Sequence, residues 1–370
     1  MGPLRPTVAA CFAHRVYHAP HYTRALTNSA LARNALSDRK AEAASVSAHK
    51  QDRPATASDA VEELRKENAV STVPNIFRGD WVLFHPVYTP EELKSVQVLH
   101  REAKTISDKL AYRMVWLARR IFDLVSGYKH PETPPSPNMT IEELRKAGYL
   151  LDDRAWLNRS LFLESIAGVP GMVAATLRHL QSLRLLRRDN GWIHTCLEEA
   201  ENERMHLMTF MTLKRPSIFL RAMILGAQGV FYNLFFLAYL VSPRTCHRFV
   251  GHLEEEAVLT YTRCIADLEA GKIPEWENTP APGIAIDYWR LHPEAKLLDV
   301  LYAIRSDETT HRFVNHSLAN LNPNGDVNPF ALREPDMHVK GTKIEFERAE
   351  SEAYVKESHE ILREKSDVPR

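Results

Sequence analysis

The sequence predicts an all-α fold built around a bundle of four long helices. Apolar residues follow helical spacing through four long stretches. These stretches cover about 153–188, 192–214, 245–270 and 294–321. Each of them also carries a Glu, or a Glu with a His, that could point to a common centre. Two further apolar helices, at about 108–128 and 217–241, are expected beside the bundle.

Composition narrows the range of functions. The chain has 370 residues, enough for one large domain or two. Its formal net charge is zero, so nothing indicates nucleic acid as a partner. The four cysteines (Cys11, Cys196, Cys246 and Cys264) are scattered without Cys-x-x-Cys spacing. That pattern argues against a zinc ribbon and against a secreted disulfide framework.

The N-terminal third divides into three segments. Residues 1–37 contain Arg but no Asp or Glu, which is typical of a mitochondrial transit peptide. A polar, Ala- and Ser-rich linker follows, so residues 1–72 are interpreted as transit peptide and flexible linker. Residues 73–107 place aromatic residues between prolines, and we expect an N-terminal arm that wraps another surface.

Two interruptions modify the predicted helices. Pro170 lies inside the 153–188 stretch and should kink it, freeing the carbonyl of Ile166. The 217–241 stretch is long enough to cross a bilayer, but Arg221, Gln228 and Asn233 interrupt it. We therefore expect a helix that lies in a membrane surface, or a buried one, rather than a span.

Residues 108–321 form the predicted helical domain, and residues 322–370 form a charged C-terminal tail. Beyond about residue 326 the tail has weak helical potential, and we expect it to be peripheral.

The candidate chemistry begins with two Glu-x-x-His pairs. Glu203 and His206 are three residues apart on one helix face, and Glu308 and His311 repeat the spacing on the last long helix. One such pair is expected by chance in a chain of this composition. Two pairs, both in long helices, are more specific, because a carboxylate and an imidazole on one face can bind a transition metal.

The other two long helices each offer a carboxylate. Glu164 lies in an apolar stretch, where an unpaired charge would be costly to bury. Glu254 opens a triplet with Glu255 and Glu256, of which at most one can face the bundle axis squarely. Glu254 shares its face with apolar residues and Tyr261, whereas Glu256 lies on a mixed face, so Glu254 is favoured.

The set comprises one Glu from each of two helices and one Glu-x-x-His from each of the other two. These are the ligands of ferritin-like di-iron or di-manganese carboxylate bundles. The sequence therefore predicts a ferritin-like four-helix bundle with a dinuclear centre. Glu203 and Glu308 are expected to bridge the two ions, and Glu164 and Glu254 to be terminal ligands.

At these motifs the chain resembles the alternative oxidases of mitochondria. Four segments, within about 77–321, carry the resemblance: Leu-Glu-Ser-Ile-Ala-Gly-Val-Pro from Leu163, Asn-Glu-Arg-Met-His-Leu from Asn202, Leu-Glu-Glu-Glu-Ala from Leu253, and Arg-Ser-Asp-Glu-Thr-Thr-His-Arg from Arg305. The resemblance also implies that Glu254 is the ligand of its triplet. The long charged tail looks more like fungal members than plant ones.

The resemblance implies a cyanide-insensitive ubiquinol oxidase that reduces dioxygen to water at a non-haem di-iron centre without pumping protons. It implies a homodimer on the matrix face of the inner mitochondrial membrane, with the helices near 108–128 and 217–241 resting in lipid. The regulatory cysteine of plant members has no counterpart here except Cys11, inside the predicted transit peptide.

The resemblance further assigns roles to matching positions. Tyr261 would be an electron donor or radical site, against the alternative of an ordinary core tyrosine. Trp192, Asn202 and Asp307 would support the ligands from an outer layer. Four residues would contact the quinol headgroup: Arg159, Leu163, Leu253 and Thr260.

Two other functions are compatible with the same ligand set. One is a different di-iron enzyme on a similar bundle, such as a quinone-precursor hydroxylase or a plastid-type quinol oxidase. The other is a ferritin-like protein that binds metal at a membrane surface without turnover. The motif from Leu163 and the position of Tyr261 favour the oxidase.

Overall fold

The computed structural model describes residues 77–78, 84–85, 87–126 and 139–366. The predicted transit peptide and linker, part of the arm and the Pro-rich loop at 130–138 lie outside these ranges. Within them the protein is helical, apart from two-residue strands β1 (Phe77–Arg78) and β2 (Phe84–His85), which pair antiparallel. The all-α prediction is confirmed.

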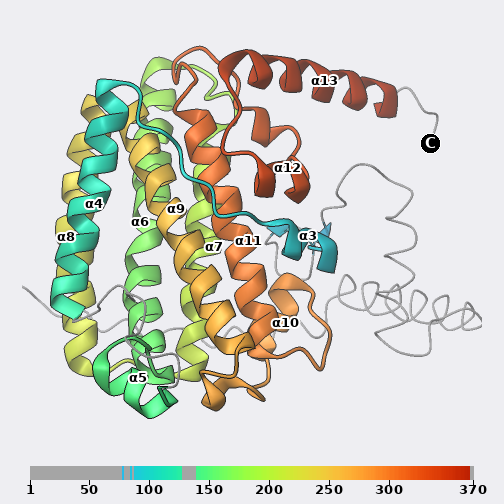
Figure 1. Cartoon of the computed structure of the whole chain (residues 1–370). Helices are drawn as coiled ribbons and strands as arrows, with labels where there is room; N and C mark the ends of the chain where they lie inside the picture. Colours follow the sequence, from blue (N-terminus) through green and yellow to red (C-terminus); the bar gives the residue numbers. More distant parts are fainter. Residues whose placement is uncertain (1–76, 79–83, 86, 127–138, 367–370) are drawn as a thin grey trace, which may run out of the picture. The chain divides into compact units, whose positions relative to one another are not determined.

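Four long helices make the bundle (Figure 1). They are α6 (Asp153–Leu185), α7 (Trp192–Leu213), α9 (Pro243–Glu269) and α11 (Leu297–Leu318). Helix α6 packs along α7, and α9 packs along α11. Local sequence signals set several ends: Asp152 accepts a hydrogen bond from the amide of Ala155, and Pro243 occupies the first turn of α9.

Helix α11 begins at Leu297, three residues later than the sequence predicts. The cause is a tertiary contact. The amide of Ala281 donates to the carbonyl of Ala295 at 2.8 Å, and the amide of Leu297 donates to Thr279 at 2.9 Å. This pairing holds residues 295–297 in extended contact with the preceding connection, which carries the short helix α10 (Gly283–Trp289).

Helix α6 is assigned as continuous across Pro170. A proline there leaves one turn of the hydrogen-bond ladder incomplete. In that turn the side chain of Gln228, from α8 (Ile218–Val241), donates to the carbonyl of Ser165 at 2.6 Å. A polar residue in an otherwise apolar helix is thus explained by a backbone acceptor on its neighbour.

Helices α4 (Ile106–Ser126) and α8 flank the bundle, α4 against α9 and α8 against α6 and α9. Both helices carry many exposed large apolar side chains. Helices α6 and α8 are each long and apolar enough to cross a membrane, but the most apolar window of α6 is 56% buried in the protein and that of α8 only 11%. Helix α6 is therefore a core helix, whereas the described part of the chain leaves most of the apolar surface of α8 uncovered.

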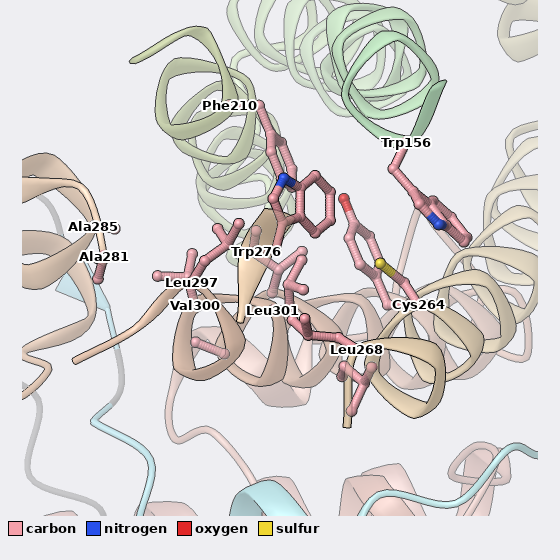
Figure 2. Close-up of a cluster of buried hydrophobic side chains, with 14 of the residues drawn as sticks. Trp156, Phe210, Cys264, Leu268, Trp276, Ala281, Ala285, Leu297, Val300 and Leu301 are labelled. Carbon is pink, nitrogen blue, oxygen red and sulfur yellow. The ribbon is translucent and has the colours of Figure 1, made fainter. Parts of the chain in front are cut away.

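One apolar cluster takes side chains from all four bundle helices (Figure 2). It includes Trp156 of α6, Phe210 of α7, Cys264 of α9 and Leu301 of α11. Each of these is 4% exposed or less. Burying a large apolar side chain stabilises a fold by about 1.5–3 kcal/mol, so this cluster fixes how the four helices face one another.

The segment before α4 and the segment after α11 are fastened to the bundle. Helix α3 (Pro90–Ser95) leads into residues 96–105, here called the strap, which runs to the start of α4 (Figure 1). The C-terminal part forms α12 (Met337–Thr342) and α13 (Arg348–Ser366). The amide of Gln97 in the strap donates to the carbonyl of Gly341 at 2.9 Å.

Buried arginines join these segments. Arg248 of α9 donates to Asp108 at 3.0 Å and to Glu345 at 2.8 Å, and Arg312 of α11 donates to the carbonyls of Gln97 and Lys340. The prediction that the chain beyond about residue 326 is peripheral is therefore wrong for residues 328–346. Neither the arginines nor their partners show any local pattern that reveals the contact.

Candidate metal centre

The six predicted ligands lie together, and all are buried. Helix α6 supplies Glu164, α7 supplies Glu203 and His206, α9 supplies Glu254, and α11 supplies Glu308 and His311. Their exposed fractions range from 0% for His206 to 6% for Glu164 and His311. The Glu-x-x-His spacing works as expected, since residues three apart on a helix point the same way.

These ligands fall into two overlapping groups. Glu164, Glu203, His206 and Glu308 offer ligand atoms that all lie within 4.8 Å of one another. Glu203, Glu254, Glu308 and His311 do the same. The two groups share Glu203 and Glu308, which is the arrangement that two neighbouring cations with two bridging carboxylates require.

Several polar atoms face this space without hydrogen bonds. Nδ1 of His206 lies 3.3 Å from a Glu164 oxygen and 3.3 Å from a Glu308 oxygen, and Nδ1 of His311 lies 2.8 Å from a Glu203 oxygen. Yet both nitrogens and both Glu203 oxygens lack a hydrogen-bond partner. Buried polar atoms without partners are costly, and a bound cation would satisfy all of them.

Electrostatics point the same way. Burial raises the pKa of Glu164 to about 8, and burial together with Glu308 and Glu203 raises the pKa of Glu254 well above its usual range. Burial alone would lower the pKa of His206 and of His311, but the surrounding carboxylates outweigh it and raise both pKa values. Without metal the cluster therefore holds protons that divalent cations could replace.

Asp307 fixes the tautomer of His206. Its carboxylate accepts a hydrogen bond from Nε2 of His206 at 2.9 Å, which leaves Nδ1 directed at the carboxylates. The same oxygen accepts from Asn202 and from Trp289 at 2.9 Å, and the other oxygen accepts from the hydroxyl of Tyr88 at 2.6 Å. A metal-binding imidazole ordinarily has such a partner on its other nitrogen.

Sequence reasoning anticipated Asn202 and Asp307 but missed Trp289 and Tyr88. Trp289 is the neighbour of Tyr288, whose hydroxyl accepts from Asn202 at 2.9 Å. Tyr88 stands 219 residues before Asp307, and no spacing rule could have joined them. Trp192, expected near the ligands, instead donates from its indole to the carbonyl of Asp326 at 3.0 Å and packs with Phe313.

Tyr261 touches the ligand cluster. Its hydroxyl donates to an oxygen of Glu164 through a short hydrogen bond. Burial and the neighbouring carboxylates of Glu164 and Glu308 raise its pKa well above the usual value, so the phenol is neutral. The ring of Tyr261 stacks with that of Phe210. Tyr261 therefore connects Glu164 to the apolar cluster of Figure 2.

The four predicted quinol-contact residues lie on α6 and α9. Arg159 is buried, its guanidinium is 3.6 Å from Asp123 of α4 and it lies over the ring of Phe122. Leu163, Leu253 and Thr260 are partly buried. The Thr260 hydroxyl donates to the carbonyl of Glu256 on its own helix at 2.7 Å.

The chain is similar to known proteins over most of this domain. Residues 88–320 match the family model described as alternative oxidase. A protein of Cryptococcus neoformans var. grubii named "Alternative oxidase, mitochondrial" is 59% identical over 288 residues, covering 77% of this chain and 72% of that protein. Proteins with the same name from Emericella nidulans and Yarrowia lipolytica are 57% and 51% identical, covering 71% and 68% of this chain and 72% and 69% of theirs.

Proposed function

The chain belongs to the alternative oxidase family and is a ubiquinol oxidase, and we propose that its buried Glu/His cluster is the di-iron centre that reduces dioxygen to water. It is a mitochondrial protein, as the names of its relatives state. The observation that carries the proposal is the pair of overlapping ligand groups that share Glu203 and Glu308.

The donor set fits two ions of iron. Four carboxylates and two imidazoles give four negative charges, which two divalent ions balance. Glu203 and Glu308 would bridge, Glu164 and Glu254 would be terminal, and His206 and His311 would bind through Nδ1. Bound iron would supply the electron transfer to dioxygen that no amino-acid side chain provides.

The chain's own residues prepare that chemistry. Asp307 holds the proton on Nε2 of His206, so the lone pair of Nδ1 stays available. Tyr261 is proposed as the redox-active side chain next to the centre, because its hydroxyl contacts Glu164 and its ring is shielded from water. The apolar cluster around Tyr261 excludes water from this side of the site.

Ubiquinol is proposed to bind beside α4, α6 and α9. Arg159, Leu163, Leu253 and Thr260 would contact its headgroup, with Arg159 held by Asp123. This pocket would open toward the lipid, so that a quinol with an apolar tail reaches it without crossing water.

The apolar surfaces of α4 and α8 support attachment to the matrix face of the inner membrane. They expose large apolar side chains: Leu110, Met114, Leu117, Ile121, Leu124, Phe219, Leu225, Val230, Leu234, Leu237 and Leu240. A helix with one apolar face rests in a membrane surface without spanning it. Homodimer formation is proposed as well; exposed Leu180, Leu183 and Leu197 on α6 and α7 would suit a contact between copies.

The decisive experiment combines oxygen uptake with metal analysis. Iron-loaded protein in liposomes should oxidise a short-chain ubiquinol in the presence of cyanide and contain two iron ions per chain. Under ¹⁸O-labelled dioxygen the label should appear only in water. Label in an organic product would replace the oxidase by a hydroxylase, and bound iron without oxygen uptake would leave only a metal-binding protein.

A further inference from the structure

A second group of metal-binding side chains lies outside the proposed di-iron centre. His252 and Glu255 of α9 and His316 of α11 offer ligand atoms within 4.8 Å of one another, and all three side chains are buried. Nδ1 of His252 lies 3.0 Å and Nε2 of His316 lies 2.7 Å from the same Glu255 oxygen. The strap adds His100, whose Nδ1 is 3.1 Å from the other oxygen.

In the described part of the chain no arginine or lysine side chain contacts Glu255, although the backbone amide of Arg101 donates to it at 3.1 Å. Arg101 and Arg248 lie close by, but they are paired with Asp108 and Glu345 at 2.7–3.1 Å. Within the described part of the chain, the ion-pair partners of Glu255 are the three imidazoles. A buried carboxylate needs compensating positive charge. Buried Arg312 supplies part of it from nearby, and the groups in direct contact with Glu255 must supply the rest as a proton on an imidazole or a metal ion.

Two further features favour a bound ligand. Nε2 of His252 is buried and has no hydrogen-bond partner, although the residue is only 1% exposed. His316 packs directly on Gly251, where a Cβ atom would come within 2.5 Å of its Nδ1, so the glycine holds room for this ring beside the helix. The side chain of His100 is 55% exposed, which gives the site a route from solvent.

We propose that His252, Glu255 and His316 bind one borderline divalent ion such as Zn²⁺, and that the exposed His100 moves in from the strap as a fourth ligand. Imidazoles with one carboxylate are the donors that such ions prefer. Arg248 donates to Nδ1 of His316 at 3.0 Å, so the proton of that ring is on Nε2. An entering ion displaces that proton to solvent, and the Arg248 charge stabilises the imidazolate that remains.

The ion joins three parts of the chain: the strap, α9 and α11. The site uses no proposed di-iron ligand, so it can be filled or empty while iron stays bound. Its test is therefore separate from that of the oxidase proposal.

The experiment titrates Co²⁺ into iron-loaded, lipid-reconstituted full-length protein. Co²⁺ serves as the probe because a tetrahedral nitrogen and oxygen site gives it intense visible absorption. One Co²⁺ per chain should bind, Zn²⁺ should displace it, and iron should stay at two ions per chain. Absence of a saturable spectrum overturns the proposal and leaves a protonated imidazole as the partner of Glu255.

Variants locate the site. His252→Gln and His316→Gln should each weaken Co²⁺ binding at least about 100-fold. Losing a residue that only supports a ligand lowers metal affinity about 10–100-fold, and losing the ligand itself should lower it more. His194→Gln is the matched control, since His194 pairs with Glu198 at 3.0 Å on the surface of α7. Unchanged affinity in His252→Gln refutes the site.

If the buried variants do not fold, His100→Gln provides the test of the site, because the exposed side chain of His100 can be changed without disturbing the core. As the loss of a direct ligand, this substitution should weaken Co²⁺ binding at least about 100-fold. No change in affinity then removes the strap from the site and overturns the four-ligand proposal.

Discussion

Replacing Asp307 by Asn should remove the negative charge next to His206 while keeping the hydrogen bond that orients its ring. The carboxylate of Asp307 accepts four hydrogen bonds, three on one oxygen at 2.9 Å and one from Tyr88 at 2.6 Å. An Asn amide can place its oxygen where the three donors converge. Its nitrogen can then donate to the Tyr88 hydroxyl, which is able to accept. The three donors on one oxygen keep their acceptor, the Tyr88 hydroxyl no longer donates to residue 307, and the negative charge is lost.

The size of the effect follows from that loss. An outer carboxylate raises the basicity of the imidazole it holds, and its removal typically costs 10–100-fold in metal affinity or activity. That range corresponds to about 1.4–2.7 kcal/mol. Asp307→Asn should therefore fold and bind two iron ions per chain at saturation. Its iron affinity should be about 10–100-fold lower, so a chelator should remove the iron at a correspondingly lower chelator concentration.

The assay is anaerobic competition for Fe²⁺ with a chromophoric chelator, followed by oxygen uptake. Asp299→Asn is the control, since Asp299 is exposed and caps the start of the same helix by accepting from the amide of Lys296 at 2.8 Å. Iron affinity of Asp307→Asn within twofold of the parent protein would refute the role assigned to this carboxylate. Loss of fold would show that charge and structure cannot be separated there.

Three further predictions address the site, the packing and the pH response. Tyr261→Phe should keep its iron, because no ligand is removed, yet lose most oxygen uptake; full activity with full iron content would make Tyr261 a core tyrosine only. Arg248→Ala removes one of the two arginines that pair with the buried carboxylates of Asp108 and Glu345 and leaves only Arg101, so it should lower the free energy of unfolding by about 1.5–3 kcal/mol in denaturant titrations. Arg145→Ala, which breaks a more exposed pair with Glu275, should cost about 1 kcal/mol or less, and equal losses would contradict the reasoning. Burial lowers the pKa of His247 to about 4. Between about pH 6.5 and 4 this histidine is therefore protonated in the unfolded chain but not in the folded one. The free energy of unfolding should fall by up to about 1.4 kcal/mol per pH unit as the pH drops through that window. His247→Gln should flatten that part of the stability curve relative to the exposed control His359→Gln, and parallel curves would exclude His247 as the cause.

The bundle and the positions of its six candidate ligands could be predicted because both depend on local periodicity. Glu203 with His206, and Glu308 with His311, share a helix face whatever surrounds them. Glu254 could be chosen over Glu256 by the face it occupies, and the structure places the remaining carboxylate, Glu255, toward His252 and His316. The helical spacing therefore carried most of the information about the centre.

What could not be predicted depends on contacts between distant parts of the chain. Tyr88 reaches Asp307 across 219 residues, and Arg248 reaches Glu345 across 97. The start of α11 depends on pairing with residues 279–281 as well as on the cap that Asp299 provides, and only the cap is local in sequence. Trp192 was misplaced for the same reason, because its partner Asp326 lies in a turn that helical spacing does not describe.

The hydrogen bond from Gln228 to the carbonyl of Ser165 has a mechanical consequence. Ser165 follows Glu164 directly, and Gln228 belongs to α8, the helix proposed to rest in lipid. If α8 rests in lipid as proposed, this bond joins the membrane-facing helix directly to the stretch of backbone that carries a candidate iron ligand.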